Sequence, residues 1–600
     1  MFYIKTFTII ILFSGFLAPK NLHAFTATVG DSEDCDFYGN DAIQQAINSG
    51  ASLILLTNEN IYNENLIIDG RSSYLEQIIG GFEGCQGARS GLPPTSEPSV
   101  IDGQQMDSVM RFINFRYSSF RLQNLKITNG LGQGLGSSGG ISLMFNNFRL
   151  IIHTVTFENN EADFGGAVNL FDDESQLFFV NSKIKDNSAH SGGGVYCSSN
   201  SSISFYRNNE ITGNLATGNG GGMNLSEYCS VNFYAQPNDP TSIMINNNLA
   251  NNHGGFAYVS QGNISVNACN NPSCKEPVIS NNHADMDLDN IGDGGAVYLS
   301  DNSSLRIAGG VLKDNKAENG GLVFLTGSHV NIHDSQINAN ITQNNGGAIY
   351  ANLGSNLTIT QNEFQDNLAK YGGALNISSG STATINRSDF ISNVGSKRGG
   401  ALYLDRSNYV VVNHSQFIDN QSDRGLVAHL ASYDDGLRLD LFANLMAHNG
   451  SISNNFQNDA VLYIQNTDPI NSRGPIMNIR HNTIVDNSEE NHVIMNDGGT
   501  LQVYNSIIYG TSNPSFASLN QPTSERFACN LTQEQGVDPR FVDSVAGDYH
   551  LTSLSPAIDQ CSNVSGSALD IDSQPFNQRS FFTFPLDRKV SDQGFDEYHP

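Results

Sequence analysis

Three carboxylates at alternate positions, Asp285, Asp287 and Asp289, form the densest cluster of chemically active side chains in the sequence. They stand in the pattern Asp-x-Asp-x-Asp-Asn, and calcium-binding loops gather oxygen ligands through alternating carboxylates. The pattern is partial, because Asn290 stands where such a loop has glycine and Ala296 where it has a bidentate glutamate. We therefore predict that the three aspartates bind calcium weakly; the alternative is a solvated acidic loop without an ion.

Residues that could cleave a polysaccharide are scattered along the chain. Glycoside hydrolysis needs two carboxylates that flank one bond, and the sequence offers the pairs Asp172–Asp173 and Asp434–Asp435. A calcium-dependent lyase needs a cationic base near its carboxylates. Such groups are brought onto neighbouring coils by Lys397–Arg398, Asp405–Arg406 and Arg424. Ordinary surface ion pairs explain the same residues. We assign no catalytic residue, and no cofactor other than the calcium expected at the aspartates.

These residues are carried by a chain that repeats one short pattern. A Gly-Gly step followed by a small or apolar residue recurs with spacings of 27, 28, 34, 40, 26, 26, 26 and 27 residues. The first glycines of the steps are Gly165, Gly192, Gly220, Gly254, Gly294, Gly320, Gly346, Gly372 and Gly399. A repeat of this size is the sequence signature of a solenoid.

Within each repeat, apolar residues alternate with other residues, as at Val297 and Leu299 or at Leu402 and Leu404. A period of two is typical of a strand with one buried face. Three such stretches occur per repeat, and no helix-length segment separates them. The sequence therefore predicts an all-β fold: a single-stranded right-handed parallel β-helix with three short strands per coil and coils about 4.8 Å apart.

An asparagine three residues after an apolar residue marks one corner of each coil. Asparagines stacked in register can hydrogen-bond from coil to coil, because an amide carries both a donor and an acceptor. We expect these asparagines to take the left-handed conformation of a sharp corner, while the Gly-Gly step forms the other corner. The predicted ladder comprises Asn160, Asn187, Asn214, Asn248, Asn282, Asn315, Asn340, Asn367, Asn393, Asn420 and Asn487.

The chain divides into four expected segments. Residues 1–24 have the basic start, apolar run and small-residue cleavage site of a secretory signal. Residues 25–105 form an N-terminal cap, with a short helix near residues 42–47 for which Asn40 or Asp41 is the expected N-cap. Residues 106–511 form the coils, and residues 512–600 form a C-terminal cap or module. Caps are expected because the end of a solenoid is an unpaired sheet edge.

The cysteines also indicate an oxidising compartment. The chain has eight cysteines, which suits a secreted protein. Proximity along the sequence suggests the disulfides Cys35–Cys85, Cys269–Cys274 and Cys529–Cys561, and leaves the pairing of Cys197 and Cys229 open. No segment after the signal is apolar enough to span a membrane.

The repeats resemble those of polymorphic outer-membrane proteins. The shared signals are a Gly-Gly-Ala step followed by Ile, Leu or Val, and a Phe-x-x-Asn step. Full copies of the second signal stand at Phe157–Asn160, Phe364–Asn367, Phe390–Asn393 and Phe417–Asn420. The resemblance covers roughly residues 138–420. It implies a β-helix exposed at a cell surface and, as in several members of that family, an adhesin.

The two ends of the chain resemble secreted bacterial β-helix proteins that carry a choice-of-anchor Q module. At the N-terminal end, the matching features are Cys35, the helix near residues 42–47 and Gly80–Cys85. At the C-terminal end they are Asp538–Phe541, Gly547–Leu551, Ser555–Asp559, Asp570–Asp572, Arg579 and Asp592–Gly594. The resemblance implies a secreted protein with the pectate-lyase-like solenoid fold, and it implies no particular chemistry.

These patterns favour a monomeric protein that is secreted or held at the outer cell surface. With 30 Lys plus Arg against 59 Asp plus Glu, its net charge is −29, which argues against nucleic acid as a partner. The leading hypothesis is a non-enzymatic, adhesin-like rod that binds a glycan or a cell surface. One alternative is a lyase or hydrolase of the pectate-lyase-like group, and a second is a structural envelope protein.

Overall fold

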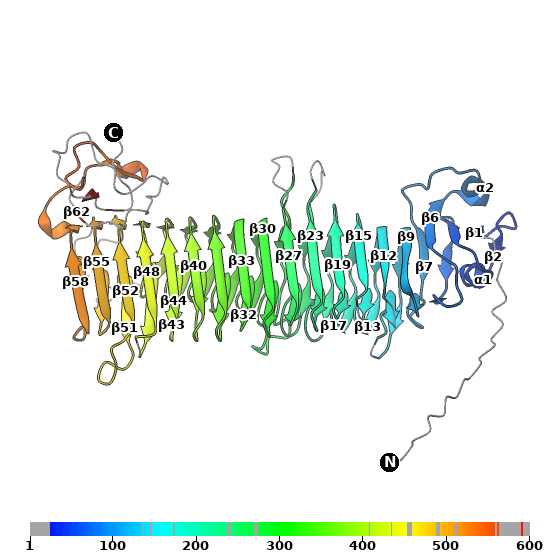
Figure 1. Cartoon of the computed structure of the whole chain (residues 1–600), viewed down its shortest axis with the longest axis horizontal. Coiled ribbons are helices and arrows are strands. Elements are labelled where there is room, and N and C mark those ends of the chain that lie inside the picture. Colours follow the sequence, from blue (N-terminus) through cyan, green and yellow to red (C-terminus); the bar gives the residue numbers. More distant parts are fainter. Residues whose placement is uncertain are drawn as a thin grey trace, which may run out of the picture.

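The computed structural model describes residues 25–134, 136–144, 147–171, 174–236, 242–268, 274–406, 408–433, 435–452, 459–485, 487, 492–510, 514–558, 561–562, 590–591 and 594. They form a straight rod of stacked coils, with the N-terminal coils at one end and the C-terminal coils at the other (Figure 1). About 18 turns are stacked, and all pairings between successive coils are parallel. The predicted all-β parallel β-helix is confirmed.

Four strand segments build a typical coil. They are β15 (Gln176–Val180), β16 (Lys183–Lys185), β17 (Ser188–Ser191) and β18 (Val195–Cys197). Each pairs with its counterpart one coil later, so the segments stack into three sheet faces: β15 and β16 in sheet A, β18 in sheet B and β17 in sheet C. A left-handed residue, Asn181, divides the sheet A face into two strands. The segment in sheet C is an additional short strand that the alternation pattern did not reveal.

The asparagine ladder is present and continuous. In each coil the side-chain amide donates to the Oδ1 atom of the next asparagine at 2.9–3.0 Å. Its second N–H donates to a backbone carbonyl of the preceding coil, as from Asn187 to Phe157 at 3.1 Å. Because the residues are 0–2% exposed, these bonds satisfy polar groups that water cannot reach. The ladder also includes Asn449, which the sequence analysis missed.

The conformation expected for the ladder residues was wrong. The left-handed residue in each coil is the one before the asparagine, which bends the chain so that the amide lies inside the corner. These residues are Asn159, Asp186, Gly213, Asn247, Asn281, Asp314, Ala339, Asp366, Ser392, Asp419 and His448. The Gly-Gly corner is as expected: its first glycine has φ of 60–70°, and a Cβ there would lie 2.1–2.3 Å from a carbonyl oxygen.

Two further polar columns run along the rod at other corners. In one, the side-chain oxygen of each residue accepts a backbone N–H from the coil before it at 2.9–3.2 Å. Its acceptors are Ser182, Asn209, Asn362, Ser388, Ser415, Asn444, Asn482, Ser506 and Asn530. A serine column makes the same bond at 3.1–3.5 Å, with acceptors Ser175, Ser303, Ser355 and Ser381. Between the columns the interior is apolar, with stacked rings such as Phe364, Phe390 and Phe417 at centroid spacings of 4.8 Å.

The N-terminal segment contains the predicted helix, α1 (Ala42–Asn48), with a different cap. Asp41 has φ of 55° and makes no side-chain capping bond. Instead, both carboxylate oxygens of Glu64 accept the N–H groups of Ile43 and Gln44, at 3.0 and 2.9 Å. A carboxylate at a helix N-terminus satisfies free N–H groups and opposes the helix dipole.

The stacked sheets extend beyond the segment boundaries expected at residues 105 and 511. Sheet A begins with β1 (Thr26–Gly30) and β3 (Leu53–Thr57) and continues to β59 (Leu531–Thr532). The second helix, α2 (Gly84–Arg89), packs beside the first strands at this end. The expected signal, residues 1–24, lies outside the described residues.

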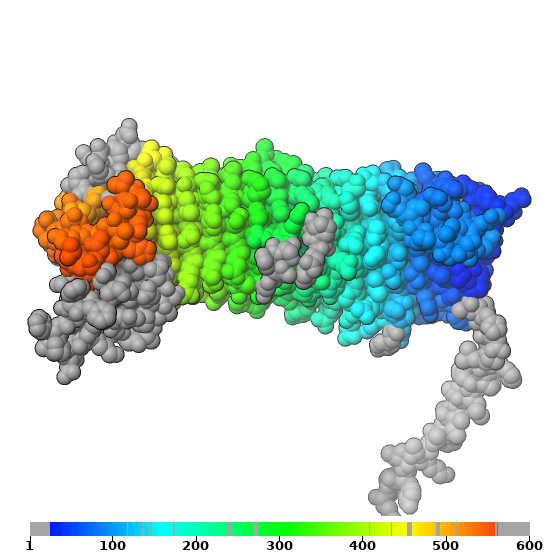
Figure 2. All heavy atoms as spheres, turned by 90° about the horizontal axis from the view of Figure 1, so that it is seen from above, coloured from blue at the N-terminus to red at the C-terminus, as the bar shows by residue number. Residues whose placement is uncertain are grey.

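The described part of the C-terminal segment folds back onto the side of the last coils (Figure 2). It contains an antiparallel pair, β60 (Phe541–Asp543) and β61 (Asp548–Leu551). Tyr549, Leu551 and Ala557 form a small apolar cluster with side chains of the last coils, which are Leu445, Ala447, Val485, Ile507 and Leu531. This segment therefore covers a lateral face of the rod.

Three disulfides link described cysteines: Cys35–Cys85, Cys197–Cys229 and Cys529–Cys561. The first and third are the predicted pairs. The second joins neighbouring coils although Leu225 stacks on Cys197, because the chain turns back toward the core after Leu225. The predicted pair Cys269–Cys274 includes Cys269, which lies outside the described residues. In the part of the chain described here, no helix is long and apolar enough to span a membrane.

Candidate ligand-binding face

The outer face of sheet B carries a column of aromatic side chains. It is formed by the outward-facing residues of β26 (Ala257–Ser260), β29 (Val297–Ser300), β32 (Val323–Thr326) and β35 (Ile349–Asn352). These residues pair in register as Tyr258, Tyr298, Phe324 and Tyr350. Stacking of the strands therefore produces a continuous aromatic surface on the outside of the rod.

Within this column, the rings of Tyr258, Tyr298 and Phe324 lie nearly parallel. The ring centroids of Tyr258 and Tyr298 are 5.1 Å apart at 8°, and those of Tyr298 and Phe324 are 5.0 Å apart at 7°. The spacing follows from the separation of paired strands. Tyr258, Tyr298 and Tyr350 remain partly exposed, whereas Phe324 is 7% exposed. Because the parallel rings cover one another's faces, the column presents the edges of the tyrosine rings to solvent. We call Tyr258, Tyr298, Phe324 and Tyr350 the aromatic column.

A histidine from the adjacent corner extends this surface. The ring of His253 lies 4.4 Å from that of Tyr298, at 23°. Its Nδ1 atom accepts the backbone N–H of Asp293 at 3.1 Å, so the neutral ring carries its proton on Nε2. Burial lowers the pKa of His253, and the ring is therefore neutral at physiological pH.

Carboxylates lie next to this histidine. Burial raises the pKa of Asp293 to about 6, although the amide of Asn319 donates to its Oδ1 atom at 2.8 Å. Burial also raises the pKa of Glu318 and of Asp285. Asp285 is part of the predicted calcium cluster, and the structure brings one ligand oxygen from each of Asp285, Asp287 and Asp289 within 4.8 Å of the others.

Further along sheet B, the outward column becomes aromatic and basic. His429 stacks between Tyr403 and Tyr463, with ring centroids 5.7 and 4.9 Å away. Burial, followed by the charges of Arg398 and Arg424, holds the pKa of His429 well below its usual range. These side chains come from β42 (Val394–Arg398), β43 (Leu402–Asp405), β47 (Ala428–Ser432), β51 (Ala460–Asn466) and the corner before β47. We call Arg398, Tyr403, Arg424, His429 and Tyr463 the basic cluster.

Two features of the basic cluster could not be read from the sequence. Asp459, at the corner before β51, is 1% exposed, and burial raises its pKa to about 7. Among the described residues, its Oδ2 atom and the Nδ1 atom of His429 have no hydrogen-bond partner. Perturbed titratable groups of this kind are common at functional sites.

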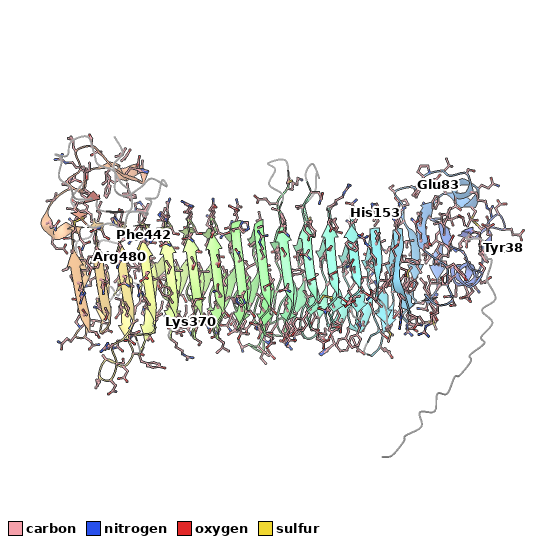
Figure 3. All side chains as sticks on the ribbon, viewed as in Figure 1. Tyr38, Glu83, His153, Lys370, Phe442 and Arg480 are labelled. Carbon is pink, nitrogen blue, oxygen red and sulfur yellow. A yellow bond between two sulfur atoms is a disulfide. The ribbon has the colours of Figure 1, made fainter. Side chains whose placement is uncertain are left out.

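The lower edge of the rod in Figure 3, where sheets B and C meet, is crowded with side chains and carries the labelled Lys370. The ammonium of Lys370 lies 5.6 Å from the ring centroid of Tyr371. The ring of Tyr371 is in turn 5.3 Å from that of Tyr403. A third cation, on β38 (Leu368–Tyr371) of the neighbouring sheet C, thus lies beside the basic cluster.

Some of the residues considered for catalysis are described by the structure, and others are not. Arg398 and Arg424 lie in the basic cluster. Asp405 lies two residues from Tyr403 and accepts a hydrogen bond from Ser378, and burial raises its pKa. Asp172–Asp173 and Asp434 lie outside the described residues, so no carboxylate pair of the kind expected for glycoside cleavage can be described around them.

A second exterior aromatic stack lies on sheet A. Phe178, Tyr206 and Tyr234 stack with ring centroids 6.3 and 5.0 Å apart, and the guanidinium of Arg149 lies 4.3 Å above the ring of Phe178. This stack on sheet A shows that aligned exterior rings also arise elsewhere on the rod.

Comparisons with models of protein families and with curated protein sequences find no match for this chain.

Proposed function

We propose that this protein is a non-catalytic binding rod, secreted or held at the outer cell surface, that holds an extended glycan along the outer face of sheet B. The three disulfides support a location in an oxidising compartment. The acidic composition, with a net charge of −29, disfavours nucleic acid and anionic membranes as partners.

The observation that carries this proposal is the aromatic column. Tyr258 and Tyr298 are partly exposed and hold parallel rings one coil apart, a spacing close to the length of one sugar unit in an extended polysaccharide. The apolar face of a sugar ring gains by covering the exposed edges of these aromatic rings, as other apolar surfaces do. Binding sites combine such surfaces with a few polar groups that fix orientation, and His253 and Asp293 supply these groups beside Tyr298.

The basic cluster favours a glycan that bears carboxylate or sulfate groups. Arg398 and Arg424 lie beside the buried rings of Tyr403, His429 and Tyr463, and a guanidinium binds planar or tetrahedral anions through several N–H groups. Salt screens charges beyond about 8 Å at physiological ionic strength. The attraction to the arginines therefore acts locally, although the protein as a whole is acidic. The bound acidic groups would therefore lie near β43 and β47.

The test uses the chain from residue 25 on a panel of neutral and acidic glycans, with analysis of the soluble products. We expect retention on acidic glycans without release of new reducing or unsaturated sugars. Tyr298→Ala should weaken retention about tenfold, which corresponds to 1.4 kcal/mol. The matched control is Tyr234→Ala, which removes a stacked exterior ring from sheet A. Equal losses in the two variants would contradict placement of the glycan on sheet B, and no retention by the unaltered chain would favour a structural role.

A polysaccharide lyase or hydrolase is the second candidate, and one observation favours it. Asp459 has a pKa raised to about 7, the range in which a carboxyl group serves as a general acid or base. It immediately precedes β51, the strand that carries Tyr463 of the basic cluster. Release of unsaturated or reducing sugars that Asp459→Asn abolishes would establish this candidate and refute the non-catalytic proposal.

A further inference from the structure

The corner between sheets C and B carries a second column of side chains beside the aromatic column, along the crowded lower edge of the rod in Figure 3. Its members pair in parallel register from coil to coil, and all are partly exposed. Each stands directly before the Gly-Gly step that leads into sheet B. The members are Asp293, Asn319, Asn345, Tyr371 and Arg398, which we call the corner column.

A chain of amides holds the carboxylate at the start of this column. The amide of Asn319, in β31 (Lys316–Asn319), donates to Asp293 Oδ1 at 2.8 Å. Asn345, in β34 (Ile341–Asn345), donates to Asn319 Oδ1 at 2.8 Å. Asn376, in β39 (Leu375–Ile377), donates to Asn345 Oδ1 at 2.9 Å. Because Asn319 and Asn345 each donate and accept within the chain, their orientation is fixed, and Asp293 is held at the edge of sheet B.

The charge of Asp293 has no cationic partner in the part of the chain that the structure describes. The basic side chain beside it is His253, whose Nδ1 atom lies 4.0 Å from Asp293 Oδ2. That ring is neutral, since its Nδ1 atom accepts the Asp293 N–H. Burial, followed by the charges of Glu318 and Asp285, raises the pKa of Asp293 to about 6 against the opposing effect of the Asn319 hydrogen bond. At pH 7.5 Asp293 is therefore ionised, and the coil of Tyr298 repels anions.

The other end of the corner column is cationic. Arg398 precedes β43, and Arg424 occupies the same corner of the next coil, where its carbonyl oxygen accepts the N–H of Gly399 at 2.9 Å. Among the described residues, neither guanidinium forms an ion pair, whereas the neighbouring Asp423 is paired with Lys397 at 3.3 Å. Both guanidinium groups therefore retain N–H donors for an anionic ligand.

The two charged ends are far enough apart to act on different parts of a ligand. Four coil steps separate Asp293 from Arg398, which corresponds to about 19 Å at the spacing of paired strands. Charges are screened beyond about 8 Å at physiological salt. The column positions between the two ends hold two amides and the Tyr371 ring, none of which is charged. The face thus changes from negative through neutral to positive along the rod.

We propose that the glycan held along sheet B is a heteropolymer whose acidic sugars are separated by several neutral ones. This inference rests on the proposed function. A neutral sugar beside Tyr298 can donate hydroxyl hydrogen bonds to the Asp293 carboxylate, and an acidic sugar about four units further along meets Arg398 and Arg424. A uniformly acidic chain gains the same contacts at the arginines but places a carboxylate against Asp293, where like charges repel.

The test titrates the chain from residue 25, at pH 7.5 and physiological salt, with three octamers of galacturonic acid. One has all its carboxyl groups free, one has them all methyl-esterified, and in the third about one carboxyl group in four is free. We expect the third octamer to bind about fivefold more tightly than either of the others. Asp293→Asn should raise the affinity for the fully acidic octamer about threefold, and Arg398→Gln should remove the advantage of the third octamer over the esterified one.

The matched control is Asp366→Asn, which removes one negative charge from an exposed corner away from sheet B and should leave the ratios of the three affinities unchanged. Each variant is judged by these ratios, which do not depend on the fraction of folded protein. Equal affinities for the three octamers, tightest binding of the fully acidic one, or equal effects of Asp293→Asn and Asp366→Asn would overturn the charge pattern and leave glycan binding standing. No binding of any octamer would overturn the charge pattern together with the proposed glycan site.

Discussion

Replacing one ladder asparagine should destabilise the coils around it far more than replacing an exposed asparagine of the same coil. Asn340 is fully buried, and its side chain makes four hydrogen bonds. Its Oδ1 atom accepts the backbone and side-chain N–H groups of Asn315 at 3.2 and 3.0 Å. Its amide donates to the Leu312 carbonyl and to Asn367 Oδ1, both at 3.0 Å.

The magnitude follows from the groups that Asn340→Ala leaves without partners. Two donors on Asn315 and the carbonyl of Leu312 lose a partner, while Asn367 Oδ1 keeps the backbone N–H of residue 340 at 3.0 Å. An unsatisfied buried group costs about 1–3 kcal/mol, and a water in the new cavity would restore part of the loss. We therefore expect a loss of about 4 kcal/mol.

Amide hydrogen exchange is the appropriate assay, because each coil of a solenoid contacts only its neighbours. In Asn340→Ala, we expect faster exchange in β33 (His329–Asn338), β34 (Ile341–Asn345) and β37 (Glu363–Gln365), with little change several coils away. Asn331→Ala is the control, since Asn331 is exposed on β33 and should change stability by less than about 0.5 kcal/mol. Equal effects of the two substitutions would refute the structural role given to the ladder.

Three other substitutions test separate parts of the structure. The raised pKa of Asp459, about 7 against 3.8, means that the folded state binds this proton more tightly than the unfolded state, so stability falls as the pH rises from 4 through 7. Asp459→Asn should therefore raise stability by up to about 4 kcal/mol at pH 8 and leave it unchanged below pH 4, as measured by urea unfolding; a pH-independent effect would contradict the burial of an ionisable group. Replacing both Cys197 and Cys229 by alanine should cost about 3–4 kcal/mol and make stability less sensitive to reductant; an unchanged unfolding midpoint would show that this bridge does not stabilise the coils. Tyr549 is 2% exposed and its hydroxyl is hydrogen-bonded to His448 at 3.0 Å, so Tyr549→Ala should cost about 3 kcal/mol and expose the C-terminal segment to proteolysis; undiminished protease resistance would mean that the segment is held in place by other contacts.

The sequence was sufficient for the coil because the same corner chemistry recurs in every repeat. The corner with a left-handed backbone requires glycine, and the corner with a buried side-chain amide requires asparagine. Each of these residues therefore recurs at nearly regular intervals along the sequence. The second polar column escaped notice because serine and asparagine both serve as acceptors there, as Ser388 and Asn362 do. The cap of α1 was misassigned because Glu64 is distant in sequence from the helix that it caps.

The candidate binding face could be inferred only in part. Alternation indicates that Tyr298 points outward, but the pairing of rings depends on loops of different length between successive coils. His253 and Tyr298 are separated by a long insertion and still stack. The burial of Glu318, which is 6% exposed, depends on its neighbours in adjacent coils and could not be predicted from the sequence.

A crystal structure of the chain with an acidic oligosaccharide chosen from the glycan panel would show whether a glycan lies along the outer face of sheet B. We expect sugar rings packed against Tyr258 and Tyr298, with acidic groups near Arg398 and Arg424. Sugar rings bound instead over Tyr206 and Tyr234 on sheet A would contradict this expectation.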